Sequence, residues 1–248
     1  MSEMVYYDLK HAATMSPSLS VQVSREIGRR IVAGTYAQDS LIEDESALAE
    51  RFQVSRAVVR DAVKILVSKG LLEVRRGIGT RVRPRSQWIL LDDDVLAWHI
   101  SAQPNCEFVR QLMDIRLCFE PMASRWAAER ATLEQISEIE HACIAMEKEK
   151  GSVENFIFAD AMFHKAVLRA AGNELLTAME GVIYLALLVS VRITNQDPRK
   201  NGTSVPFHRE LYSAIARREA EKAEQLTEKL LTDASRRLQE AAKLNEIR

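Results

Sequence analysis

Residues 42–83 contain the feature that most constrains the fold, because helical and extended patterns follow one another there in a fixed order. Apolar residues at helical spacing follow Asp44, a good N-cap, and again follow Ser55, so two short helices joined by a tight turn are predicted. Gly70 ends the second helix, and two strand-like segments then flank a glycine-punctuated hairpin at residues 75–79. This order of helix, turn, helix and hairpin predicts a winged helix-turn-helix.

The second helix and the hairpin carry most of the positive charge of this region. Between residues 55 and 85 there are 9 basic and 2 acidic residues. Arg56 and Arg60 are four apart and share a helix face, where guanidinium groups suit bidentate contact with guanine in a major groove. The pattern predicts binding to double-stranded DNA. The candidate contact residues are Ser55, Arg56, Arg60, Lys64, Arg75, Arg76 and Gly77.

Each of these residue types has a physical reason to contact DNA. Ser55 is expected to cap the helix and leave its N-terminal amides facing phosphate. Lys64 lies one turn beyond the arginines and is expected to meet phosphate, while Gly77 permits close backbone approach at the wing tip. The alternative is that the charges are ordinary solvated helix residues. Their coincidence with a helix, turn, helix and wing in the right order favours DNA binding.

Charge is divided unevenly along the chain. Residues 16–86 contain 13 basic and 8 acidic residues, whereas residues 87–248 contain 20 and 25. A basic first part and an acidic second part suggest two separate tasks. A length of 248 residues and a hydrophobic fraction of 47% allow two ordinary domains with cores of their own.

The sequence gives no sign of export or of membrane insertion. Its three cysteines are odd in number and lack Cys-x-x-Cys spacing, so neither a disulfide framework nor a zinc finger is expected. The first 16 residues lack the apolar centre of a signal peptide, and the longest apolar run, residues 182–189, is too short to span a bilayer. We therefore expect a soluble cytoplasmic protein with no membrane partner.

The second part of the chain is predicted to be helical throughout. Glycine and proline become sparse after residue 95, and turn signals separate segments of helical periodicity. The predicted fold class is mainly α, with a winged helix-turn-helix followed by an all-α bundle of six or seven helices. The predicted parts are a flexible tail at 1–16, the winged helix-turn-helix at 17–84, a linker with a first helix at 85–105 and the bundle at 106–245. Helices are expected at about 92–101, 106–131, 133–150, 152–171, 174–195, 204–217 and 219–243.

Residues 55–62 (SRAVVRDA), together with residues 69–72 (KGLL) and 76–79 (RGIG), resemble the GntR superfamily of bacterial transcription regulators. The resemblance implies that Arg56, Arg60 and the wing residues contact an operator. Members commonly begin the first of the two helices with Leu-Pro-Ser-Glu. This chain has the acidic run Ile42-Glu43-Asp44-Glu45 instead.

Three stretches of the helical part resemble the FadR branch with its FCD-type effector domain: residues 109–130, 158–173 and 208–223. Together with the first motif, the resemblance covers nearly the whole chain after residue 18. Residues 88–98 and 120–132 look most like the galactonate-operon repressor subgroup. The resemblance implies a homodimer in which residues 106–245 bind a small carboxylate effector such as a sugar acid (an aldonate).

Asp160, His164 and His208 are candidate ligands of a divalent metal, Zn²⁺ or a similar ion. Asp160 and His164 are four apart on one helix face, and His208 opens a different helix that could converge on them. The alternative is a local ion pair or a satisfied buried histidine. The resemblance places a fourth ligand near Leu230, which cannot bind metal, and Asp233 lies one turn further along the same face.

Arg116 is the main candidate for binding the effector carboxylate, because a guanidinium inside a bundle needs an anionic partner and its planar fork fits a carboxylate. The alternative is an i,i+4 pair with Glu120. Arg192 is a second cationic candidate, and Asn173 fits a helix N-cap equally well. The candidate effector-binding residues are Arg116, Asp160, His164, Asn173, Arg192 and His208.

We therefore predict a metabolite-responsive DNA-binding regulator, a repressor that leaves its operator when a small carboxylate binds, and not an enzyme. Two other interpretations remain open at this point. A metal-dependent enzyme could activate water at Asp160, His164 and His208, although no nucleophile or separate general base stands out. Alternatively, the helical part could serve only to form a DNA-binding dimer with no effector.

Overall fold

The computed structural model describes residues 17–102, 106–194 and 203–246, which form two compact units divided after residue 103. The chain is mainly α, with one small two-stranded sheet in the first unit, so the predicted fold class is confirmed. The predicted tail at 1–16 lies outside the described residues. Among the helices that the structure describes, none combines the length and apolar character needed to cross a bilayer.

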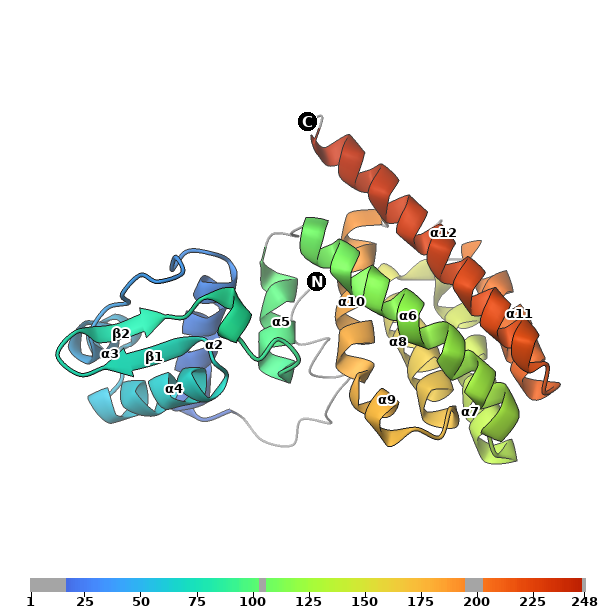
Figure 1. Cartoon of the computed structure of the whole chain (residues 1–248), viewed down its shortest axis with the longest axis horizontal. Coiled ribbons are helices and arrows are strands. Elements are labelled where there is room, and N and C mark those ends of the chain that lie inside the picture. Colours follow the sequence, from blue (N-terminus) through green and yellow to red (C-terminus); the bar gives the residue numbers. More distant parts are fainter. Residues whose placement is uncertain (1–16, 103–105, 195–202, 247–248) are drawn as a thin grey trace. The chain divides into compact units, whose positions relative to one another are not determined.

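The first unit is a helix-turn-helix followed by an antiparallel hairpin, the wing (Figure 1). In the hairpin, Leu72 lies opposite Val82 and Arg75 lies opposite Gly79. The elements are α2 (Leu19–Val32), α3 (Glu45–Phe52), α4 (Arg56–Ser68), β1 (Leu72–Arg75), β2 (Gly79–Val82), the 3-10 turn η1 (Arg85–Gln87) and α5 (Asp93–Ser101).

Local sequence signals place the two helices of the motif. The side chain of Asp44 accepts hydrogen bonds from the first amides of α3, and that of Ser55 accepts one at the start of α4. Between them Gln53 adopts the left-handed conformation (φ 53°), which ends α3 and turns the chain. Val59, Ala62, Val63 and Leu66 then point into the core, which leaves the opposite face of α4 exposed.

Helix α5 packs into the core of this first unit. Trp98 is fully buried, and a Cβ added at Gly28 of α2 would lie 2.3 Å from its ring. The ammonium of Lys69 lies 2.8 Å from carboxylate oxygens of both Asp92 and Asp94. The segment predicted as a linker with a first helix therefore contributes side chains to the core beneath the wing.

The second unit is a bundle in which α6 and α12 run side by side (Figure 1). Helix α10 is buried on every side from Val182 to Val189, because its apolar residues follow one another without a polar face. The helices are α6 (Cys106–Arg130), α7 (Leu133–Lys148), α8 (Val153–Ala170), α9 (Glu174–Ala178), α10 (Glu180–Thr194), α11 (Val205–Ala216) and α12 (Ala220–Glu246), with the short turn η2 (Glu149–Gly151).

One predicted helix differs from the structure. The expected single helix at 174–195 is two helices, α9 and α10, separated at Met179. The amide of Met179 bonds to the carbonyl of Leu176, three residues back, so the chain closes a tighter turn there instead of continuing the α-helical pattern. Met179 is itself a good helix former, and Gly181, two residues further, is the nearest residue that disfavours a helix.

Candidate DNA-binding and effector sites

The exposed face of α4 carries three of the predicted DNA-contacting side chains. Arg56, Arg60 and Lys64 are all exposed and recur every fourth residue. The hydroxyl of Ser55 accepts a hydrogen bond from the amide of Val58 at 3.3 Å, so Ser55 caps the helix. The N-terminal end of α4 therefore presents unpaired amides and two guanidinium groups to solvent, an arrangement that attracts phosphate.

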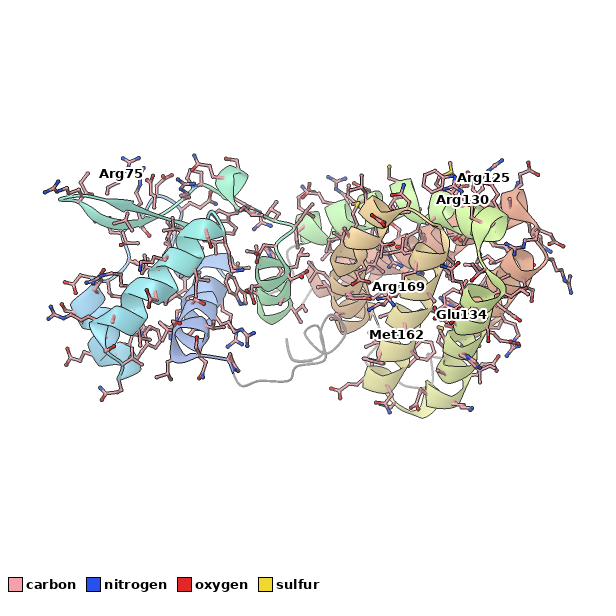
Figure 2. All side chains as sticks on the ribbon, turned by 90° about the horizontal axis from the view of Figure 1, so that it is seen from below. Arg75, Arg125, Arg130, Glu134, Met162 and Arg169 are labelled. Atoms are coloured by element: carbon pink, nitrogen blue, oxygen red, sulfur yellow. The ribbon has the colours of Figure 1, made fainter. Side chains whose placement is uncertain are left out.

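The wing tip presents the other predicted contacts. Arg75 ends β1, Arg76 and Gly77 lie in the turn between the strands, and all three are exposed. Arg75 points away from the core (Figure 2). Gly77 has φ 77°, and nothing lies within 4 Å of where its Cβ would be. The tip therefore needs a residue that tolerates the left-handed conformation, and its backbone is open to a close approach.

Some of these arginine and lysine side chains form ion pairs within the protein, and others do not. Arg60 pairs with Glu45 at 2.8 Å, Lys64 pairs with Asp61 of its own helix at 2.9 Å, and Arg75 pairs with Glu73 at 3.0 Å. In the part of the chain that the structure describes, Arg56 and Arg76 form no ion pair.

In the second unit, the three predicted metal ligands converge. Asp160 and His164 come from α8 and His208 comes from α11. One ligand atom from each residue lies within 4.8 Å of the other two, and all three side chains are shielded from solvent. The ring of Phe163 packs edge-on against both imidazoles, with centroids 5.9 Å and 4.9 Å away, and holds them in place.

The hydrogen bonds around this cluster determine which imidazole nitrogens face it. His208 Nδ1 lies 2.8 Å from the carbonyl of Ser204, and His164 Nδ1 lies 2.7 Å from a carboxylate oxygen of Glu120. Both partners only accept, so we assign the proton to Nδ1 in each ring. The Nε2 lone pairs are then directed toward Asp160, at 3.0 Å for His208 and 3.7 Å for His164.

This arrangement of acceptors fits a divalent cation. Asp160 Oδ1 and His208 Nε2 form no hydrogen bond of good geometry with any described residue, despite their 3.0 Å separation. Burial acts to raise the pKa of Asp160, but its polar neighbours outweigh burial and lower that pKa, so the carboxylate is ionised. An ionised carboxylate and two lone pairs that converge in a buried place repel one another unless a cation lies among them.

Arg116 and Glu120 form a buried pair beside this cluster. Only 2% of Arg116 and 3% of Glu120 is exposed, and two hydrogen bonds join the Nε and Nη2 atoms of Arg116 to Glu120. Burial acts to raise the pKa of Glu120, but attraction to Arg116 and the hydrogen bond from His164 outweigh it and lower that pKa to about 2. The i,i+4 pair that we considered as the alternative for Arg116 thus exists, within the polar cluster and not on the surface.

Glu120 is the residue that sequence reasoning missed as part of the site. It accepts hydrogen bonds from both Arg116 and His164 and so joins the candidate anion-binding residue to the candidate metal ligands. Its position four residues after Arg116 was the available signal.

The remaining predicted residues lie in different settings. Asn173 caps α9, where its side chain accepts from the amide of Leu176 at 3.1 Å. The side chain of Arg192 lies outside the described residues. Leu230 is buried on α12, and Asp233 pairs with two arginines, Arg236 and Arg237.

A winged helix-turn-helix with an exposed basic face, accompanied by a helical domain with a buried polar cluster, defines a DNA-binding regulator with a separate sensor domain. Comparison with known sequences supports this class of protein. Residues 19–82 match the bacterial regulatory proteins of the gntR family, and residues 111–233 match the FCD domain. The chain belongs to the GntR family of bacterial regulatory proteins, in the group that carries an FCD domain.

Relatives extend this assignment over nearly the whole chain. The galactonate operon transcriptional repressor of Escherichia coli (strain K12) is 33% identical over 215 residues, which are 86% of this chain and 94% of that protein. The transcriptional repressor NanR of Klebsiella aerogenes is 28% identical over 237 residues, covering 94% of this chain and 90% of that protein. These relatives are regulators, so the interpretation of Asp160, His164 and His208 as the centre of an enzyme is not supported.

A solved structure supports the fold. The chain described as "Lar controls the expression of the Listeria monocytogenes agr system and mediates virulence" superimposes with a TM-score of 0.67 at 16% identity, and the match covers 92% of this chain and 99% of that one. At this identity the match shows the fold alone.

Proposed function

We propose that this protein is a repressor that leaves its operator when a small sugar acid, an aldonate, binds in the FCD domain. The observation that carries the proposal is the buried chain of contacts from Arg116 through Glu120 and His164 to Asp160 and His208. It offers a guanidinium for a carboxylate and polar atoms for hydroxyl groups. The galactonate operon repressor among the relatives supports the choice of an aldonate.

The guanidinium of Arg116 has one edge suited to the effector. Glu120 occupies Nε and Nη2, while Nη1 forms no hydrogen bond within the described residues. A carboxylate approaching from the Nη1 side can therefore bind without first displacing Glu120. A buried group of this kind discriminates strongly between a carboxylate and a neutral group, because an unpaired buried charge costs free energy.

The charge of the cluster explains why a metal belongs to the proposal. Metal-ligating imidazoles are neutral, so Arg116, Glu120 and Asp160 together carry a net charge of about −1. That charge repels an anionic effector. Asp160, His164 and His208 would hold a divalent ion such as Zn²⁺, which supplies a positive charge and a Lewis-acidic contact for effector oxygens. Glu120 and the carbonyl of Ser204 orient the two imidazoles toward it.

We further propose that the protein acts as a homodimer on a palindromic operator, with one α4 helix in each half-site. Support comes from an apolar stripe on the outer face of α6: Ile115, Cys118, Phe119 and Met122. Ile115 is 43% exposed, Cys118 is exposed, and the other two are partly exposed. The positions are symmetric about the middle of the stripe, so two antiparallel copies of α6 would place Ile115 opposite Met122 and Cys118 opposite Phe119.

Sedimentation tests the dimer. Phe119→Asp should convert a dimer of the full chain to a monomer, because it buries a charge in the proposed interface. Leu133→Asp provides the control, since Leu133 is 83% exposed at the start of α7. Equal dimerisation by both variants would rule out this face.

The effector is tested by fluorescence anisotropy with an operator duplex selected from a random library. Galactonate and gluconate should release the protein, whereas galactitol, which lacks the carboxylate, should not. Chelator treatment should abolish release but leave DNA binding intact, and metal analysis of the same sample should show loss of the bound ion. A protein that ignores every sugar acid, with metal present, would favour a DNA-binding dimer without an effector.

A matched pair of variants assigns the carboxylate contact. Loss of Arg116 alone would leave Glu120 buried without its charge partner, so the informative variant is Arg116→Met with Glu120→Gln. Arg110→Met is the control, because Arg110 lies exposed on the same helix and pairs with Glu107 and Asp114. The double variant should bind DNA and ignore galactonate, while the control should respond normally. Normal release of the double variant would remove Arg116 from the effector site.

A further inference from the structure

One ion pair on the DNA-facing surface joins the two helices of the helix-turn-helix. Arg60 of α4 donates Nε and Nη2 to the two carboxylate oxygens of Glu45 on α3, at 3.2 Å and 2.8 Å. The residues are fifteen apart in sequence, and their side chains are 58% and 40% exposed. The carboxylate therefore holds the guanidinium from a neighbouring helix in a two-pronged contact, which fixes its direction better than one hydrogen bond does.

The anchor of this contact is itself fixed. Glu45 is the first residue of α3, and the side chain of Asp44 caps that helix by accepting from the amides of Ser46 and Ala47, both at 2.9 Å. The two helices share a core that includes Leu48 and Val59. The position of the Glu45 backbone relative to Arg60 is therefore determined by packing and capping.

The contact leaves the end of the guanidinium available to DNA. Glu45 occupies the Nε side, while Nη1 has no partner within the described residues, and the edge formed by Nη1 and Nη2 remains directed away from the carboxylate. An arginine reads guanine through two parallel hydrogen bonds to O6 and N7. A guanidinium already held in one orientation loses less side-chain freedom when it makes that contact.

We propose that Glu45 is a positioning residue for DNA recognition: it aims Arg60 and thereby sets the base-pair preference of α4. This inference rests on α4 being the DNA-reading helix of the proposed function. It gives a role to the acidic run at residues 43–45, which by charge alone would weaken binding to phosphate. Arg56, which has no ion pair in the described structure, is free to adapt to different bases or to phosphate.

A different reading of the same pair is that Glu45 merely neutralises Arg60. The two ideas predict different effects of Glu45→Gln, which keeps the size of the side chain and removes its charge. Simple neutralisation predicts that the variant binds every DNA sequence more tightly by the same factor, with a steeper dependence on salt. Positioning predicts a change confined to one base pair.

The experiment uses the full chain, a duplex selected from a random library, and every single-base-pair variant of that duplex, with Kd measured by anisotropy at fixed salt. Arg60→Gln should abolish the preference at one base pair, which identifies the base that Arg60 reads. Glu45→Gln should weaken the preference at that same base pair about tenfold, within the range typical of one lost base contact. It should add no further effect in the Arg60→Gln background.

Asp61→Asn is the matched control, because Asp61 is an exposed carboxylate paired with another cation of α4, Lys64. It should change affinity evenly across all duplexes. Glu45→Gln overturns the proposal if it also acts evenly, or if it changes preference at other base pairs. If Arg60→Gln leaves every position unchanged, Arg60 reads no base and the proposal fails, while Arg56 could still give α4 its DNA-reading role. Thermal unfolding by circular dichroism checks that each variant retains the wild-type fold.

Discussion

The first unit should lose stability in mild acid, because it buries a neutral histidine. Only 9% of His99 is exposed; its Nδ1 lies 2.7 Å from the carbonyl of Val95, and its Nε2 lies 3.0 Å from Nη2 of Arg85. Nδ1–H donates a hydrogen bond to the carbonyl of Val95, and Nε2 accepts one from the guanidinium of Arg85, so the second contact requires the neutral ring. Burial, together with the charge of Arg85, lowers the pKa of His99 to about 4.

The size and direction of the effect follow from that pKa. In the unfolded chain, a histidine takes up a proton below its ordinary pKa of about 6.5, whereas the folded unit resists protonation until about pH 4. Stability is therefore complete above pH 6.5 and falls as the pH is lowered through this window. The loss is about 2 kcal/mol at pH 5 and approaches about 3 kcal/mol below pH 4.

Hydrogen exchange of the full chain measures this loss in the unit itself. Between pH 8 and pH 5, the local opening free energy of amides in α2 and α5 should fall by about 2 kcal/mol after correction for intrinsic exchange. His99→Gln keeps both hydrogen bonds without a titrating proton, and its change should be below about 0.5 kcal/mol. An equal acid response in the wild type and His99→Gln would refute the reasoning, since His99 is the only histidine among the described residues of this unit.

Three further changes test other contacts. Gly28→Ala should destabilise the first unit by roughly 1–3 kcal/mol in urea unfolding, because its Cβ would overlap Trp98; an unchanged midpoint would show that α5 shifts freely. Ser55→Ala should cost about 1 kcal/mol by loss of the cap on α4, with Ser55→Asp restoring it; no cost for Ala would contradict the cap. Glu120→Gln should destabilise the second unit by about 3 kcal/mol, because Arg116 loses a buried charge partner; a cost below about 1 kcal/mol would mean that water reaches the pair.

Much of the fold was predictable because its signals are local. Asp44 and Ser55 mark helix starts by side-chain chemistry that is visible in the sequence, and the glycines of the wing mark a turn. The break at Met179 was not predicted, since Met179 itself favours a helix and a single glycine at 181 is a weak signal. The inclusion of α5 in the first core was also missed, because the fit of Trp98 against Gly28 joins residues seventy apart.

The candidate sites likewise contain residues that the sequence predicts and contacts that only the structure shows. The triad of Asp160, His164 and His208 could be proposed from spacing and resemblance, and the structure brings its atoms together. Glu120 could not be placed at the site from spacing alone, because an i,i+4 pair looks the same in sequence whether it is exposed or buried. The contact between Glu45 and Arg60 was likewise hidden, because it spans two helices.

Glu120 also has a consequence for how the sensor would respond inside a cell. One carboxylate accepts from both the candidate effector arginine and a candidate metal ligand. If both sites are used as proposed, occupancy of one would change the free energy of binding at the other. Such coupling is reciprocal: if a metal ion strengthens the binding of a sugar acid by some factor, the sugar acid strengthens retention of the metal by the same factor. On the proposed mechanism, the metal supply of the cell would set the concentration of sugar acid at which the operator is released.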